Sequence, residues 1–236
     1  MSAEAQPSVS VIIPTFNAAA FVEDTLSHVI AELHADDEII VIDDASSDGT
    51  ADVAEGFLDA NCSMDWQVLL TPTNLGPPAA RNRGIGAARG EIIMSADHDD
   101  HWTPGHRTSL IQTLDGHDIV SGRAVFRLSD AAVPHEGRAW WRAEWLEQAQ
   151  QLCEFGASAI RRECFESIGL LDEKFRFGGD DVEWFSRAQS AGLSRHEIDA
   201  VVLERTIHAN NLSGDPRLRQ ELLDVVRHHL QRDSSC

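Results

Sequence analysis

Three aspartates gather at the end of one apolar stretch. The sequence MSADHDDHWTP, residues 94–104, begins as a strand and then places Asp97, Asp99 and Asp100 close together. Carboxylates this close repel one another, so they need a counter-ion, a protonated member or full solvation. Their hard oxygen atoms suit Mg²⁺ or Mn²⁺, and either ion keeps coordination positions open for the oxygens of a diphosphate. The motif favours a metal-assisted site for an anionic ligand, with a solvated acidic loop as the alternative.

Two further pairs of adjacent aspartates could contribute to the same kind of site. Asp43 and Asp44 follow the apolar run EIIVI, and Asp180 and Asp181 stand in FGGDDVEW. The second pair has another interpretation, because carboxylates at the N-terminus of a helix are stabilised by the helix dipole. Its meaning depends on where the fold places it relative to the other aspartates.

Histidine and tryptophan give two weaker signals. His98 and His101 flank the first cluster, but we rank a zinc site below a Mg²⁺ or Mn²⁺ site because oxygen atoms dominate the ligand set. Trp140, Trp141 and Trp145 are spaced as on a helix. Aromatic residues at that spacing mostly pack in a core, and one or two of these could line the rim of an acceptor site.

The charge balance excludes some classes of partner. The chain has 236 residues, with 39 Asp and Glu against 19 Lys and Arg, and a net charge of -20. This argues against nucleic acid or anionic lipid as a bulk electrostatic partner, so an anionic ligand must be held locally. No apolar run approaches the roughly 20 residues of a membrane span. The four cysteines have no paired spacing and indicate free thiols in a cytoplasmic protein.

Alternating strands and helices predict the architecture of the first half. Apolar runs at residues 9–14, 38–42, 66–71 and 90–97 are separated by helical patterns, including one from about Thr50 and one around 82–88. Such βαβ units form a parallel sheet with both faces covered, in which ligands lie outside the carboxyl ends of the strands. This gathers six residues around one crevice: Pro14, Asp43, Asp44, Asp97, Asp99 and Asp100.

The second half is less regular. Thr103 and Pro104 suit the N-cap and first position of a helix running to about Leu114. Strands are expected in DIVSGRAVFRLS and HEIDAVVLERTIH, and helices in the Trp-rich stretch 137–156 and at 181–191. The last helix is amphipathic and packs either on the domain or on a second subunit, which would make a homodimer. Its apolar face is expected to contain Leu222, Leu223, Val226 and Leu230.

Several motifs in order resemble one family. VSVIIPTFN, VIDDASSDGT, NLGPPAARNRGIGAARGE, SADHDDHWTP and GLLDEKFRFGGDDVEW are similar to motifs of the family 2 glycosyltransferases with the GT-A fold. The resemblance runs from about Val9 to Ser213. It implies a single α/β domain with a Rossmann-like, mostly parallel sheet and helices on both faces. The nucleotide-binding half would span about 8–103, the acceptor-side half about 104–215, and the C-terminal helix about 216–232.

The resemblance also implies roles for individual residues. Asp181 matches the catalytic base, with Asp180 beside it where the family has glutamate, and Asp99 matches the metal-binding aspartate that Asp100 supports. His208, in ERTIHANNLS, completes the metal shell, touches a phosphate, or is a solvated strand-end histidine. The remaining expected nucleotide-site residues are Pro14, Phe16, Asp43 and Asp44 at the base and ribose, Arg81 and Asn82 at the base or phosphates, and Asp97 near the ribose.

The implied reaction is inverting transfer of a sugar from a nucleotide-diphospho-sugar to an acceptor hydroxyl. Mn²⁺ or Mg²⁺ would be the cofactor and UDP the common nucleotide, while the acceptor could be a saccharide, a lipid-linked molecule, a small molecule or a peptide. One alternative is a haloacid-dehalogenase-like phosphatase, but Ala45 stands where its motif needs a second aspartate. A nucleotidyltransferase would need a Gly-rich phosphate loop that PTFNAAAF lacks. A non-catalytic nucleotide-sugar-binding module is the third alternative.

Overall fold

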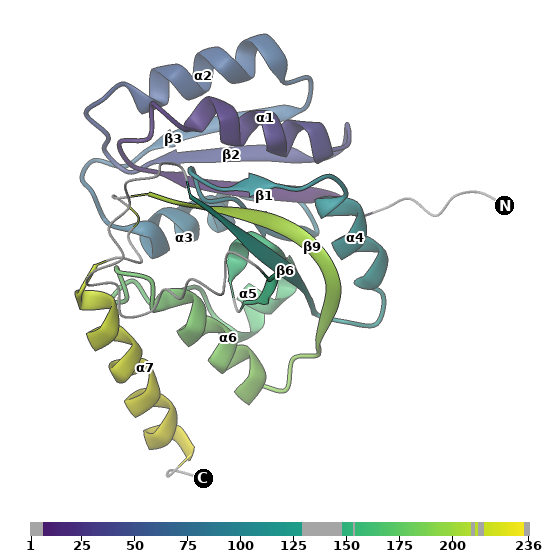
Figure 1. The fold of residues 1–236 in the computed structure, drawn as a ribbon. Coiled ribbons are helices and arrows are strands. Elements are labelled where there is room, and N and C mark those ends of the chain that lie inside the picture. The colour runs from purple at the N-terminus through teal and green to yellow at the C-terminus, as the bar shows by residue number, and fades with distance from the viewer. Residues whose placement is uncertain (1–6, 129–147, 153, 209–210, 212–214, 234–236) are drawn as a thin grey trace, which may run out of the picture.

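A nine-stranded sheet forms the centre of the computed structural model, which describes residues 7–128, 148–152, 154–208, 211 and 215–233. Figure 1 shows the sheet between two groups of helices. The strands are β1 (Val9–Thr15), β2 (Glu38–Asp43), β3 (Asp65–Leu70), β4 (Ile92–Ser95), β5 (His101–Trp102), β6 (Ile119–Leu128), β7 (Gln150–Gln151), β8 (Ser158–Arg161) and β9 (Arg195–Ile207).

The sheet has a parallel half and a mixed half. The main order is β3-β2-β1-β4-β8-β6-β9-β5, with β7 paired to β6. The pairs β3–β2, β2–β1 and β1–β4 are parallel, as the βαβ pattern predicts. β8 runs antiparallel to both β4 and β6, β6 is parallel to β9, and β5 is antiparallel to β9. The expectation of a mostly parallel sheet therefore holds for the first half of the chain only.

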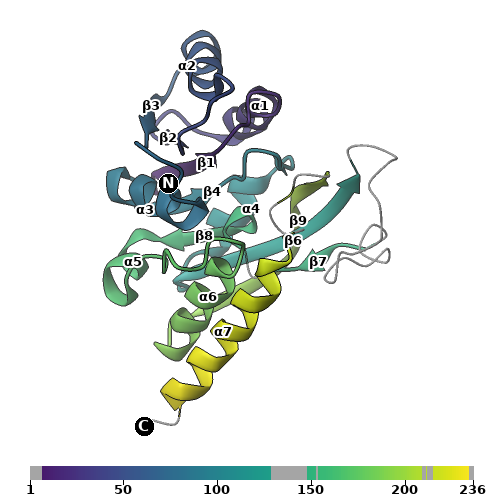
Figure 2. The same ribbon diagram turned by 90° about the vertical axis from the view of Figure 1, so that its left-hand side faces the viewer.

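Helices cover both faces, as Figure 2 shows from the side. One apolar core lies under α1, α2 and α4, and a second lies against α3, α5 and α6. Every residue of β1 is buried, because Val9, Val11 and Ile13 face the first core and Ile12 faces the second. The helices are α1 (Val22–Glu32), α2 (Thr50–Asn61), α3 (Pro77–Ala87), α4 (His106–Thr113), α5 (Arg162–Ile168), α6 (Asp180–Ser190) and α7 (Arg217–Asp233), with a 3₁₀ turn at Phe155–Ala157.

Two helix starts differ from the sequence prediction. α4 begins at His106 after Gly105, which has φ 84°, so Thr103 is not its cap. The Thr103 hydroxyl donates instead to the Val201 carbonyl at 2.8 Å and ties the turn to β9. α3 begins at Pro77, well before the expected start near 82, because proline suits the first turn of a helix.

The C-terminal part also corrects expectations. The Trp-rich stretch, including Trp140, Trp141 and Trp145, falls largely outside the described residues. In its described part, Gln150–Gln151 is strand, and Phe155 and Gly156 belong to a 3₁₀ turn and not to an α-helix. α7 packs through Glu221 and Val225, whereas Leu223 and Val226 are 46% and 55% exposed.

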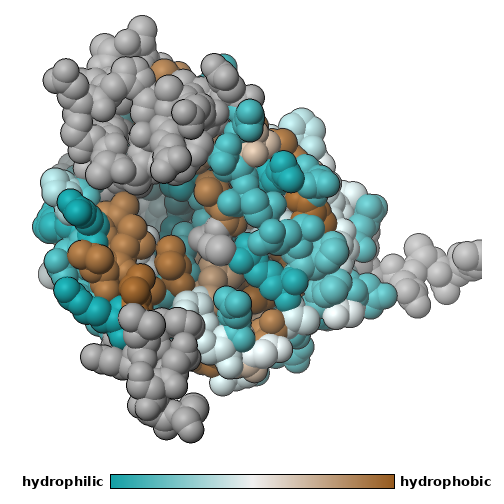
Figure 3. Space-filling model, turned by 60° about the horizontal axis from the view of Figure 1, so that its bottom comes forward, coloured by the Kyte–Doolittle hydropathy of each residue, from teal (hydrophilic) through white to brown (hydrophobic). Residues whose placement is uncertain are grey.

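Figure 3 shows apolar surface gathered beside a hollow on the underside of the molecule. Within the described residues, no helix has the length and apolar character to span a membrane.

Candidate active site

The loops after β1 and β2 hold each other at the carboxyl edge of the sheet. Asn17 and Ala45 both have positive φ, at 48° and 61°, so each strand ends in a sharp turn. The Asn17 amide N–H donates to Ser46 Oγ at 2.8 Å, and Ser47 N–H donates to Asn17 Oδ1 at 2.9 Å. Phe16, just after β1, is 43% exposed. Pro14 is buried, and its carbonyl lies 3.3 Å from His98 Nδ1.

Asp43 and Asp44 are both buried but differ in their partners. Asp44 accepts hydrogen bonds from the Leu75 and Gly76 amides, the latter at 2.7 Å, and from the Thr71 hydroxyl at 2.8 Å. It therefore shapes the loop that leads into α3. Asp43 accepts one bond, from Ser46 N–H at 3.2 Å, while its Oδ1 is buried without a partner among the described residues. Of the two, Asp43 has the acceptor capacity left for a ligand.

Arg81 joins the first aspartate cluster to the last one. Its guanidinium, buried on α3, donates to Asp97 Oδ1 at 2.6 Å and to Asp180 Oδ2 at 2.8 Å. Asp181 Oδ1 lies 4.0 Å from the same group. Burial opposes the charge of Arg81, but the surrounding carboxylates outweigh it and raise the guanidinium pKa. The structure thus brings together three of the predicted aspartates around one cation.

Asn82, the next residue on α3, makes its hydrogen bonds with a different segment, the one before α6. Its amide donates to the Leu171 carbonyl at 2.9 Å and accepts from Leu171 N–H at 2.9 Å. Its nitrogen also donates to Glu173 at 3.1 Å. With both ends of the amide engaged, Asn82 holds the segment before α6 and does not join the aspartate cluster.

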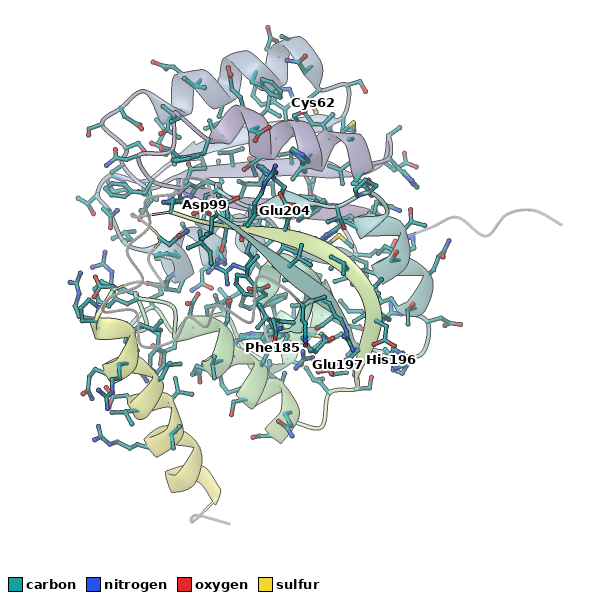
Figure 4. All side chains as sticks on the ribbon, viewed as in Figure 1. Cys62, Asp99, Phe185, His196, Glu197 and Glu204 are labelled. Atoms are coloured by element: carbon teal, nitrogen blue, oxygen red, sulfur yellow. The ribbon has the colours of Figure 1, made fainter. Side chains whose placement is uncertain are left out.

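Asp99 and His208 form a second pair in the crevice. His208 Nε2 lies 2.8 Å from Asp99 Oδ2, which also accepts from Asn211 Nδ2 at 3.0 Å. The Phe21 ring stacks on the His208 imidazole with centroids 5.2 Å apart. Burial alone would raise the pKa of Asp99, but the His208 hydrogen bond and nearby positive charge outweigh it and lower that pKa. Figure 4 shows Asp99 near the end of β9.

Asp100 lies behind Asp99 beside a second arginine, Arg205, whose side chain is 25% exposed. Its carboxylate accepts from Thr206 N–H at 3.0 Å and lies 3.3 Å from Arg205 Nε. Arg205 also donates to Glu154 Oε2 at 2.7 Å, while Glu154 Oε1 is buried and unpartnered among the described residues. Burial raises the pKa of Asp100 and that of Glu154, against the opposing charge of Arg205.

Glu154 is a site residue that sequence reasoning missed. It stands in an irregular segment before a 3₁₀ turn, with no motif around it. Arg205 lies in ERTIHANNLS, the stretch in which the sequence analysis singled out His208. The burial of Glu154 and its ion pair with Arg205 become visible only in the fold.

Asp180 and Asp181 stand in the first turn of α6, as the helix-terminus interpretation expects, and both carboxylates lie beside Arg81. Burial is the main reason that the pKa of Asp181 lies well above its ordinary value, and the adjacent Asp180 charge raises it further against Arg81. Burial likewise raises the pKa of Asp180. Asp181 Oδ1 accepts no hydrogen bond among the described residues, with Arg81 4.0 Å away, while the side chain keeps 22% exposure. This carboxylate has the environment of a proton acceptor.

Glu221 on α7 holds the loop that presents this pair. Its carboxylate accepts hydrogen bonds from the Arg176, Phe177 and Gly179 amides at 2.6, 2.9 and 3.1 Å. No signal near Glu221 in the sequence pointed to this contact. The buried face of α7 thereby positions the residues just before Asp180.

Among the residues that the structure describes, carboxylates outnumber cations in the crevice, even with both arginines counted. Six acidic side chains surround Arg81, Arg205 and His208: Asp97, Asp99, Asp100, Glu154, Asp180 and Asp181. Two arginines cannot compensate six charges, so some carboxyls stay protonated or a cation enters. The repulsion expected from the sequence is therefore real, and part of its compensation comes from arginines distant in the chain.

The fold and the crevice define a class of protein. A mannosyltransferase from Pyrobaculum calidifontis, solved in complex with GDP-Man and Mn²⁺, matches with a TM-score of 0.74 and 20% identity over 99% of this chain and 66% of that one. Residues 1–349 of TarS from S. aureus, solved with UDP, match with a TM-score of 0.67 and 17% identity over 94% of this chain and 65% of that one. The expected GT-A fold is confirmed.

The family follows from the sequence comparison. The family model described as Glycosyl transferase family 2 matches residues 10–168, so the chain belongs to that family, as its motifs indicated. The glycosyltransferase AglE of Haloferax volcanii is 29% identical over 202 residues, which cover 80% of this chain and 63% of that protein. Across three curated relatives, the chain spans 38% to 67% of their length.

Proposed function

We propose that this chain is a metal-dependent inverting glycosyltransferase that moves a sugar from a nucleotide-diphospho-sugar to an acceptor hydroxyl. The observation that carries the proposal is the bridge made by Arg81. It joins Asp97, at the exit of β4, to Asp180 and Asp181, at the start of α6. The strand-exit aspartates and the proposed base therefore share one crevice at the carboxyl edge of the sheet, where α/β folds bind nucleotides.

The donor set around Asp99 fits a divalent cation. Two neighbouring ligands of an octahedral ion at about 2.1 Å lie about 3 Å apart, and Asp99 Oδ2 lies 2.8 Å from His208 Nε2. Asp99 and His208 would hold the ion, leaving the other positions to phosphate oxygens and water. The imidazole favours Mn²⁺ over Mg²⁺. When bound, the ion neutralises charge that develops on the leaving diphosphate.

Asp181 is the proposed general base. It accepts the proton of the acceptor hydroxyl as that oxygen attacks the anomeric carbon and the nucleoside diphosphate leaves from the opposite face, which inverts the anomeric centre. Its raised pKa makes it a stronger proton acceptor than an ordinary aspartate. Arg81 keeps this carboxylate near the sugar end of the site, because Asp97 holds the other end of the guanidinium.

The nucleotide is proposed to bind at the loops after β1 and β2. Phe16 offers an exposed ring and Asp43 a free carboxylate oxygen there. Direct contacts by Pro14, Asp44 and Asn82 stay predictions, and the hydrogen bonds of Asp44 and Asn82 favour a positioning role. UDP was the sequence expectation, and the two solved GT-A proteins carry UDP and GDP-Man. The identity of the nucleobase in the donor is therefore the first thing to measure.

Thermal unfolding identifies the nucleotide. UDP, GDP, dTDP and CDP are each added with and without Mn²⁺ or Mg²⁺, since a ligand that binds only the native state raises the midpoint. We expect one of the four nucleotides to raise the unfolding midpoint, and to do so mainly when metal is present. If no nucleotide shifts the midpoint with either metal, the proposal fails.

Two variants separate the proposed role of Asp99 in metal binding from the proposed role of Asp181 as the general base. Asp181→Asn should bind the nucleotide-sugar and Mn²⁺ normally but lose most release of nucleoside diphosphate, whereas Asp99→Ala should lose the metal-dependent part of binding. Asp59→Asn, an exposed change on α2, is the control and should match the parent. Equal loss of nucleotide affinity in both site variants would contradict the assigned roles.

Other expectations remain open to the same assays. Membership of family 2 disfavours a phosphatase or a nucleotidyltransferase, while turnover with any acceptor would exclude a non-catalytic binding module. The acceptor class, the homodimer and the cytoplasmic location stay predictions. The acidic surface, with net charge -20, still argues against a nucleic-acid partner.

A further inference from the structure

A second group of metal-ligating side chains lies outside the crevice. Asp24 and His28 stand one turn apart on α1, and His101 lies on β5. One ligand atom from each lies within 4.8 Å of the others, and this is the one group of three or more such residues found in the described part of the chain. His98, the other histidine beside the first aspartate cluster, is not part of this group, and its Nδ1 lies 3.3 Å from the Pro14 carbonyl oxygen.

His101 is held from both sides of its ring. Its Nε2 lies 2.9 Å from Asp24 Oδ2, and its Nδ1 lies 3.7 Å from Glu204 Oε1 on β9. Glu204 is in turn paired with Arg127 at 2.9 Å. A carboxylate behind a histidine is the usual outer partner of a metal-bound imidazole, since it orients the ring and raises its basicity. Figure 4 shows Glu204 on β9, below α1 in this view.

The two imidazoles are stacked on each other. The His28 and His101 rings lie 4.2 Å apart with 5° between their planes, and His28 Nδ1 lies 3.8 Å from Asp24 Oδ1. Parallel rings do not aim their lone pairs at one point, so one ring must turn to share an ion. The side chains of His28 and Asp24 are 39% and 64% exposed, which leaves them room to turn towards the more enclosed His101.

The donor chemistry selects the kind of ion. Two imidazoles and one carboxylate suit Zn²⁺ and other first-row transition metals, whereas Mg²⁺ prefers oxygen ligands alone. Three protein ligands leave a fourth position for water. Asp24 and His28, four residues apart on one helix, stand on the same face, so they need no change in the backbone to act together.

We propose that Asp24, His28 and His101 form a site for a Zn²⁺-type dication, with Glu204 as the outer carboxylate. The ion ties α1 to β5 and, through Glu204, to β9. It is separate from the Mn²⁺ or Mg²⁺ site proposed at Asp99, because that residue pairs with His208 and Asn211. The proposal does not depend on the enzymatic activity.

The test uses the full chain, freed of metal and titrated with Zn²⁺ by calorimetry and with Co²⁺ by its visible absorption. Asp99→Asn should retain the proposed site and thereby separate it from the crevice. His28→Gln and His101→Gln should each weaken binding by at least the roughly 10–100-fold that loss of an outer partner costs. Glu204→Gln should weaken Zn²⁺ binding by a factor within that range.

A matched control comes from another stacked pair. His196, exposed on β9, stacks on His117 with centroids 4.8 Å apart and is absent from the ligand group. His196→Gln should leave Zn²⁺ affinity unchanged. Zn²⁺ binding that survives both His28→Gln and His101→Gln, or that disappears in Asp99→Asn, would overturn the site. Absence of measurable Zn²⁺ binding by the parent chain would overturn it as well.

Discussion

Replacing Arg81 with methionine tests whether this arginine is the counter-ion of the crevice. The substitution keeps an unbranched side chain of similar length but removes the cation 2.8 Å from Asp180 and 2.6 Å from Asp97. The side chains of Arg81 and Asp180 are 8% and 3% exposed, so water cannot replace the lost partner of Asp180. Asp97, at 30% exposure, can be rehydrated in part.

The expected loss can be estimated in two ways. Unit charges about 4 Å apart attract by about 4 kcal/mol at an effective dielectric constant near 20. Removing one partner of a buried ion pair costs about 3–5 kcal/mol in measured cases. For a chain of this size, each kcal/mol moves the melting temperature by about 2–4 °C. Arg81→Met should therefore lower it by roughly 6–20 °C.

The loss should also depend on pH. Without Arg81, the pKa of Asp180, already raised by burial, rises further in the folded state. The destabilisation is complete above that pKa and shrinks as pH falls through it, because a protonated Asp180 needs no counter-ion. Chemical denaturation at several pH values measures this trend directly.

The comparison variants make the reasoning refutable. Arg227→Met removes an ion pair whose side chains are 63% and 46% exposed, and should cost less than about 1 kcal/mol. In the Asp180→Asn background, Arg81→Met should cost much less than in the parent chain. If Arg81→Met costs no more than Arg227→Met, or if Asp180→Asn gives no relief, the buried bridge does not stabilise the site as described.

Three other perturbations have defined outcomes. Glu221→Gln leaves one carboxylate oxygen fewer for the Arg176, Phe177 and Gly179 amides. It should lower kcat more than nucleotide affinity, with Leu223→Ser on the exposed face as a silent control. The pH profile of turnover should lose activity as pH falls through the raised pKa of Asp181, with its acidic limb above 3.8, and a limb at or below that value would contradict the base assignment. Gly84→Ala would bring a Cβ to 2.5 Å from Ile12 Cγ2 and should cost about 1–3 kcal/mol by denaturant unfolding. Gly86→Ala on the same helix meets nothing within 4 Å and should be neutral or stabilising by up to about 1 kcal/mol.

The local pattern of residues was sufficient to predict the strands and helices of the first half and the residues at which those strands end. Runs of Val and Ile marked β1 and β2, and helical spacing marked α1, because burial on a pleated or helical face has a fixed period. The aspartates that follow these strands could be placed at one edge, since parallel strands end together. Thr103 misled the prediction for α4, because its hydroxyl bonds to a carbonyl on β9 that no local rule could anticipate.

The roles within the site were harder to assign. Asp44 and Asn82 carry the same motif signal as Asp43 and Arg81, yet their polar atoms are taken up by loops of the protein itself. A motif records which residues are present and at what spacing. It does not record which of two adjacent side chains points into the crevice, because that depends on what the neighbouring loops offer as partners.

The sequence by itself was enough for the α/β class, for the family and for placing Asp97 and Asp99 just after a buried strand. Only the tertiary structure decided how their charges are compensated. Arg81 and Asp180 are 99 residues apart, and Glu221 reaches Gly179 across 42. Short-range patterning encodes strands, helices and their ends, whereas the pairing of buried charges depends on which distant segments meet once water is excluded.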